Sequence, residues 1–279
     1  MPIIRVIFYF LLILTIFSCS KKEAKKSIIF EKSQEDQMIE AYKKGLEELN
    51  SGDVIYAARK FNEVEIIYPQ SIWAPRASLM AAYSYYSQSY FDDSIIELNR
   101  FLKKYPNHSN KDYAYYLLGL SYYDQMIDET KDTQIIYKAK NYFEKVVNDY
   151  PNTDFALDSE FKLELIKELL AAKEMYIARY YLDREKWIPA LNRFKLVVTD
   201  YDDTIFIEEA LFRLVELNYK IGLEKEAKKY AYLLGYNYQS SEWYSKSYTI
   251  FNKDYTNVKI KEDKSRTGKI LENFKKLLK

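Results

Sequence analysis

The feature that most constrains this chain is a pattern of small and large residues that recurs every 37 positions. A Tyr-Pro dipeptide, or Tyr-Asp in the last case, begins at each of four positions: Tyr68, Tyr105, Tyr150 and Tyr201. Twelve residues before the second member of each dipeptide stands a small residue, in order Ala57, Ser94, Ala139 and Ala190. Eight residues before it stands a large apolar residue, in order Phe61, Leu98, Phe143 and Phe194. Self-similarity at such a period predicts a stack of equivalent units.

A second small position, farther upstream, completes each unit. It is occupied in successive repeats by Gly45, Ala82, Gly119, Ala178 and Val215. This spacing is typical of a tetratricopeptide repeat, where small residues let two helices approach and the large residue fills the space between layers. We therefore predict an all-α fold, a right-handed α-α superhelix of about five tetratricopeptide-like helix pairs, over residues 37–251. The alternative is an ordinary helical bundle whose periodicity is accidental.

Two insertions interrupt the period. The upstream small positions are separated by 37, 37, 59 and 37 residues, so one interval contains 22 extra residues. Eight of them fall in the connection at 126–136, and fourteen lengthen the helix predicted at 154–182. Gly52 and Gly222 are expected at turns between helices, and Pro75 and Pro189 near helix starts. A closing helix is predicted within 240–251.

The N-terminus has the layout of a secretory signal. Arg5 precedes an apolar run of 12 residues, 6–17, which is shorter than the roughly 20 residues needed to span a bilayer. The only cysteine, Cys19, follows this run, and 16–19 resembles the lipobox at which bacterial lipoprotein precursors are cut before an acylated cysteine. We therefore expect a signal peptide at 1–18 and a lipidated tether at 19–36. An uncleaved membrane anchor with a free thiol is the alternative.

The residue inventory disfavours catalysis. His108 is the only histidine and has no cysteine partner, so the inventory argues against a catalytic triad and against a conventional zinc site. Neither a Gly-rich phosphate loop nor an EF-hand loop is present. Residues 1–251 carry a net charge of −4, which gives no basic field for nucleic acid. We expect no enzymatic activity, no cofactor, no metal site and no nucleic-acid partner.

Over about residues 37–250 the chain resembles the BamD (ComL) family, tetratricopeptide lipoproteins of the β-barrel assembly machinery in Gram-negative outer membranes. Besides Cys19, the resemblance lies in the segments 56–86, 97–124, 139–159, 178–204 and 233–248. It implies an adaptor on the periplasmic face of the outer membrane that binds the periplasmic domains of BamA and helps capture and insert unfolded outer-membrane proteins. The alternative is another periplasmic tetratricopeptide scaffold that coordinates cell-envelope or cell-wall complexes, such as the coordinator that works with the Tol system.

The resemblance also implies site residues. Arg193 aligns with an arginine that in the family reaches toward the last periplasmic domain of BamA; otherwise it is a solvated helix position. The N-terminal repeats are expected to receive the C-terminal aromatic strand of a client protein, in a groove formed by Tyr68, Trp73, Tyr85 and Tyr86. Among these four, we expect Tyr68 and Trp73 to be exposed and Tyr85 to be buried.

The C-terminal tail, 252–279, lies outside the resemblance and carries a net charge of +5. Its last residues place five apolar side chains on one face of a helix: Ile270, Leu271, Phe274, Leu277 and Leu278. Four lysines flank this face: Lys269, Lys275, Lys276 and Lys279. We expect a separable element that docks on a partner, lies on anionic lipid or stays frayed.

Overall fold

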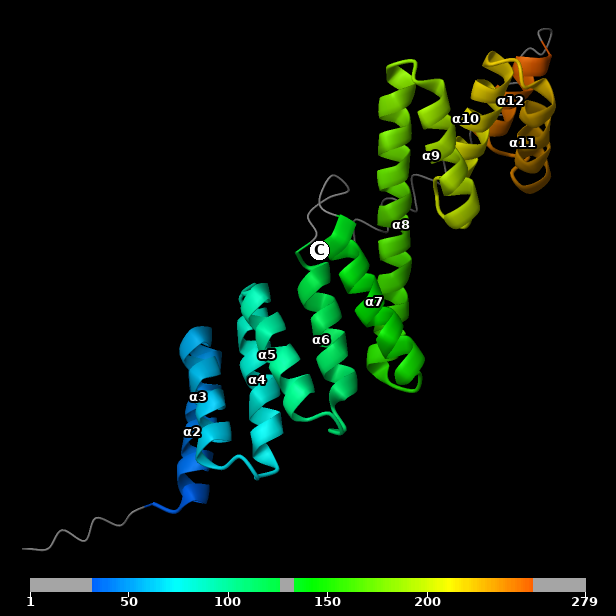
Figure 1. The fold of residues 1–279 in the computed structure, drawn as a ribbon. Coiled ribbons are helices and arrows are strands. Elements are labelled where there is room, and N and C mark those ends of the chain that lie inside the picture. Colours follow the sequence, from blue (N-terminus) through cyan, green and yellow to red (C-terminus); the bar gives the residue numbers. More distant parts are fainter. Residues whose placement is uncertain (1–31, 126–132, 253–279) are drawn as a thin grey trace, which may run out of the picture.

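The computed structural model describes residues 32–125 and 133–252, and every regular element in these ranges is a helix. In chain order the helices are α2 (Gln34–Ser51), α3 (Val54–Ile67), α4 (Trp73–Ser87), α5 (Phe91–Lys104), α6 (Lys111–Tyr123), α7 (Thr133–Asp149), α8 (Asp154–Asp183), α9 (Trp187–Asp200), α10 (Ile207–Lys220), α11 (Glu224–Asn237) and α12 (Glu242–Phe251). Each helix packs against the next, and the helix pairs stack side by side into an elongated array (Figure 1). The predicted superhelix of tetratricopeptide-like pairs is confirmed.

Local sequence signals set the helix ends. The side chains of Ser33, Asp53 and Thr153 each accept a hydrogen bond from a backbone N–H in the first turn of α2, α3 and α8. Gly52 and Gly222 have φ angles of 90° and 85°, a left-handed conformation that glycine adopts without a steric cost. Both glycines therefore lie at turns between helices, as predicted.

The small and large positions pack as the repeat predicts. Phe61, Phe143 and Phe194 are fully buried. A Cβ atom added to Gly45 would lie 2.8 Å from the Phe61 ring, and one added to Gly119 would lie 2.6 Å from the Phe143 ring. Only glycine lets the two helices of these repeats approach so closely.

The lengthened helix is confirmed as α8, which has 30 residues. Ile166 and Leu170 in its middle pack with Phe143 of α7, while Met175 and Ala178 nearer its C-terminal end pack with α9 and α10. This single helix therefore joins the first repeats to the last ones (Figure 1). The other insertion falls mainly on 126–132, outside the described residues.

The described part of the chain ends with α12, the predicted closing helix, which packs on α10 and α11. Trp243 contacts Phe212 with ring centroids 5.2 Å apart. None of the helices in the described ranges is long and apolar enough to cross a membrane. Cys19, the tether and the tail from residue 253 onward lie outside these ranges, so the proposed domain boundaries at both ends stay predictions.

Candidate partner-binding surfaces

Trp73 is the first residue of α4, and Tyr68 is the C-cap residue of α3; both side chains are partly open to solvent. Their exposed fractions are 37% and 39%, which agrees with the exposure predicted for both. The Trp73 ring meets Tyr42 of α2 edge-on at 5.2 Å, and the Arg76 guanidinium lies 5.5 Å from the Trp73 ring centre. These contacts hold the indole in place while about a third of the residue stays exposed.

Tyr85 and Tyr86 lie at the other end of α4 and are half-buried. Tyr85 packs against the core of the first repeat, and burial raises the pKa of its hydroxyl. The Tyr86 hydroxyl donates to Asp124 at 2.5 Å; burial, followed by this hydrogen bond, raises the pKa of Tyr86. Both side chains are therefore engaged mainly in repeat packing.

The four predicted aromatic residues do not form one cluster. Trp73 and Tyr85 are 12 residues apart on the same helix, or about 18 Å along its axis. The structure instead places two exposed residues, Tyr68 and Trp73, on either side of the α3–α4 connection and two half-buried ones, Tyr85 and Tyr86, near the C-terminal end of α4. An aromatic client strand could use the first pair without reaching the second.

A row of tyrosines and carboxylates connects the first helices of successive repeats, and the sequence analysis did not find it. Tyr86 of α4 donates to Asp124 at the end of α6, and Tyr116 of α6 donates to Asp158 of α8 at 2.7 Å. The rings of Tyr116 and Phe155 lie 5.1 Å apart. The only signal in the sequence is that the paired residues are separated by 38 and 42 positions, close to the repeat period.

Glu65 joins the first two repeats through a buried charge cluster. Its carboxylate accepts from the Tyr105 hydroxyl at 2.5 Å, from Lys104 at 2.9 Å and from Arg100. Burial alone would raise the pKa of Glu65, but the hydrogen bonds from Tyr105, Arg100 and Lys104 outweigh it and lower this pKa. The cluster joins the two repeats, because the buried acceptor lies on α3 and all three donors belong to α5 or its C-cap.

Arg193 lies on α9 and reaches back to α8. Its guanidinium forms an ion pair with Glu174 at 2.8 Å and remains partly exposed. Lys195, two residues along the same helix, is exposed. A partner carboxylate could therefore approach Arg193, but it would share the guanidinium with Glu174.

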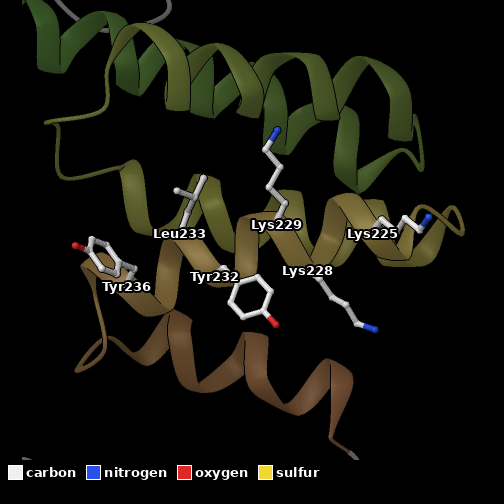
Figure 2. A pocket seen from close by; sticks show the side chains of 6 residues that line it. All are labelled: Lys225, Lys228, Lys229, Tyr232, Leu233 and Tyr236. Carbon is white, nitrogen blue, oxygen red and sulfur yellow. The ribbon is translucent and has the colours of Figure 1, made fainter.

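The outer face of α11 is a further exposed surface that the sequence analysis missed. Figure 2 shows three lysines and three apolar or aromatic side chains on it: Lys225, Lys228, Lys229, Tyr232, Leu233 and Tyr236. Tyr232 and Tyr236 are among the most exposed aromatic residues that the structure describes. Cationic and aromatic side chains together suit a partner with acidic or aromatic groups.

The described residues offer no cluster of histidine, cysteine or acidic side chains that could hold a metal ion. His108 has a role in its own loop, because its Nδ1 accepts from the backbone N–H of Asn110 at 3.1 Å. Its ring also packs edge-on against Phe101.

The sequence profile of the YfiO family, described as "Outer membrane lipoprotein", matches residues 34–234. This chain belongs to that family. It is 34% identical over 238 residues to the outer membrane protein assembly factor BamD of Caulobacter vibrioides, covering 85% of this chain and 77% of that protein. It is 39% identical over 216 residues to BamD of Rickettsia prowazekii, covering 77% of this chain and 86% of that protein. The predicted resemblance to the BamD family is confirmed.

Among solved structures, the chain is similar to the TPR2AB domain of yeast Sti1, at 11% identity with a TM-score of 0.43. That alignment covers 77% of this chain and 82% of the yeast domain. The YfiO match runs from the start of α2 to near the end of α11 and includes Arg193 and the four aromatic residues. Relatives in the BamD family are named for assembly rather than for catalysis.

Proposed function

We propose that this protein is an adaptor of the β-barrel assembly machinery, held at the periplasmic face of the outer membrane by lipid on Cys19. The observation that carries the proposal is membership of the YfiO family over residues 34–234. A tetratricopeptide superhelix suits an adaptor because its stacked first helices and its helix ends offer extended surfaces to other proteins.

BamA is the partner proposed for the α8–α9 region, through Arg193. Supporting this assignment, the guanidinium is partly exposed and is already oriented by Glu174. A guanidinium has five N–H donors, so it can keep this ion pair and still bind a carboxylate of BamA.

Co-purification from detergent extracts tests this contact. Arg193→Glu should release BamA, since loss of one partner from a desolvated charge pair costs on the order of 2–5 kcal/mol of binding. The same substitution also places a carboxylate beside Glu174, so a reversed pair, Glu174→Arg with Arg193→Glu, is needed to separate the two effects. If Arg193 itself contacts BamA, the reversed pair restores the ion pair but not BamA binding.

Lys195→Glu is the matched control, because it makes the same change in charge two residues away on α9. It should retain BamA. Recovery of BamA by the reversed pair would mean that only the α8–α9 ion pair matters, and recovery of Tol-associated proteins in place of BamA would favour the cell-envelope scaffold.

Client capture is proposed for the exposed pair Tyr68 and Trp73. These side chains offer flat apolar surface to an alternating aromatic strand, at low cost in side-chain entropy. Tyr85 and Tyr86 are secondary candidates, since their hydroxyl ends and edges are already used in packing.

A double variant, Tyr68→Ala with Trp73→Ala, should lose binding of a C-terminal peptide from an outer-membrane barrel protein, as measured by fluorescence anisotropy. Its circular dichroism spectrum and its co-purification with BamA should not change. Tyr232→Ala with Tyr236→Ala removes two exposed aromatic rings from α11 and should bind the peptide like wild type. An equal loss of peptide affinity in both double variants would mean that the peptide binds non-specifically to exposed aromatic side chains.

A further inference from the structure

An apolar stripe on the N-terminal half of α8 is left uncovered by the fold. Leu157 and Phe161 are 71% and 60% exposed, and Leu165 is 38% exposed. These residues are four apart, so they lie on one face and extend over about 12 Å. We call this face the α8 stripe.

The lengthening of α8 explains why the α8 stripe is bare. Only the C-terminal part of α8 packs with α9 and α10, through Met175 and Ala178. The N-terminal part packs with α6 and α7, and in Figure 1 no further helix lies beside it on its other side. Fourteen inserted residues therefore extend the helix beyond the layer that would cover it.

Two exposed acidic groups flank the α8 stripe. Glu160 and Glu164 are exposed on the same side of the helix, and neither forms an ion pair or a hydrogen bond with another described residue. Ile205, which is 80% exposed, lies near the C-terminal end of the α8 stripe, because its backbone N–H donates to Glu168 of α8 at 3.3 Å. The surface thus combines apolar area with negative charge, which favours a cationic amphipathic segment.

We propose that the C-terminal segment of this same chain, residues 269–279, docks on the α8 stripe as an amphipathic helix. Its apolar face, from Ile270 to Leu278, extends over about 12 Å as a helix and so matches the stripe in length. Lys275 and Lys276 flank that face and are opposite in charge to Glu160 and Glu164. The lysine-rich face of α11 is nearer to the start of the tail, but it would repel this segment.

The chain between α12 and this segment is long enough. Residues 253–268 number 16 and reach at most about 58 Å when extended. Contacts run from α12 to α10, from α10 to α9 and from α9 to α8. Three such steps of about 10 Å, taken at right angles to the α8 axis and combined with its whole length of about 45 Å, give a separation of about 55 Å.

Photo-crosslinking in the full-length protein tests the proposal. A benzoyl-phenylalanine at position 161, irradiated in detergent and mapped by mass spectrometry, should crosslink to peptides from 269–279 of the same chain. The same probe at position 66 on α3, where Ile66 is 79% exposed, should not. A reciprocal probe at position 274 should crosslink to peptides from 154–168. Because this second probe leaves Phe161 in place, it tests the same contact with an unaltered stripe.

Charge reversal provides a second test of the same proposal. Glu160→Lys with Glu164→Lys should lower the crosslink yield by about tenfold, and adding Lys275→Glu with Lys276→Glu should restore it. Mixing isotope-labelled and unlabelled protein identifies the partner chain. Crosslinks between differently labelled chains would overturn the proposal, and so would crosslinks to lipid or to another protein instead of the tail. The proposal would also fail if neither probe, at position 161 or at position 274, gave a crosslink between α8 and the tail.

Discussion

Glu65 joins the first two repeats, because its one buried carboxylate accepts from Arg100, Lys104 and Tyr105. Glu65→Gln should keep an acceptor for Tyr105, but it removes the negative charge paired with Lys104 and leaves Arg100 with Glu97 as its ion-pair partner. We expect a loss of about 1–2 kcal/mol in the free energy of unfolding at neutral pH, measured by urea titration. Because the folded-state pKa is lowered, the contribution of Glu65 is present above the unfolded value of about 4.3 and is lost as pH falls through the folded value.

The difference between wild type and Glu65→Gln should therefore shrink in acid. Glu63→Gln is the matched control on the same helix, since Glu63 forms only a surface pair with Lys60 at 2.6 Å. That substitution should change stability by less than about 0.5 kcal/mol. Equal effects of the two substitutions would show that the buried cluster contributes no more than a surface ion pair.

At the scale of elements, the contact between α6 and α7 depends on Gly119 facing Phe143. Gly119→Ala places a methyl group 2.6 Å from that ring, and we expect overpacking to cost about 1–2 kcal/mol after the better helix propensity of alanine is counted. Phe143→Leu should relieve the clash, because the second repeat has alanine and leucine, Ala82 and Leu98, at these positions. Urea unfolding of the two single variants and the double variant should give a favourable coupling energy of at least about 0.5 kcal/mol. Strict additivity would mean that the helices move apart to accept the methyl group.

For the whole molecule, the decisive question is how it is attached to the membrane. We predict that Cys19 becomes the mature N-terminus and is triacylated, since each buried methylene contributes about 0.8 kcal/mol and one chain alone is only marginal. Cys19→Ala should leave full-length precursor that takes up no labelled palmitate in cells, whereas Ser20→Ala should be labelled and processed. Lipid label on the Cys19→Ala protein would place the attachment elsewhere.

The sequence by itself determined the architecture of this protein. In a solenoid each repeat contacts only its neighbours, so a period in the sequence becomes a period in the fold. The small and large residues, such as Gly45 with Phe61, predicted which side chains meet between the two helices of a repeat. Gly52 and Gly222 marked turns because few other residues adopt their φ angles. Family membership was likewise visible in the sequence.

Only the tertiary structure decided which surface residues are free to bind. It placed Trp73 and Tyr85 at opposite ends of α4, and it gave Arg193 an intramolecular partner in Glu174. It also left Phe161 uncovered, although an apolar residue in a helical pattern is normally expected in the core. The physical reason is that exposure depends on what the neighbouring layer covers. Which residues the neighbouring layer covers is set by the lengths and rotations of the adjacent helices. The spacing of apolar residues within one helix does not specify it.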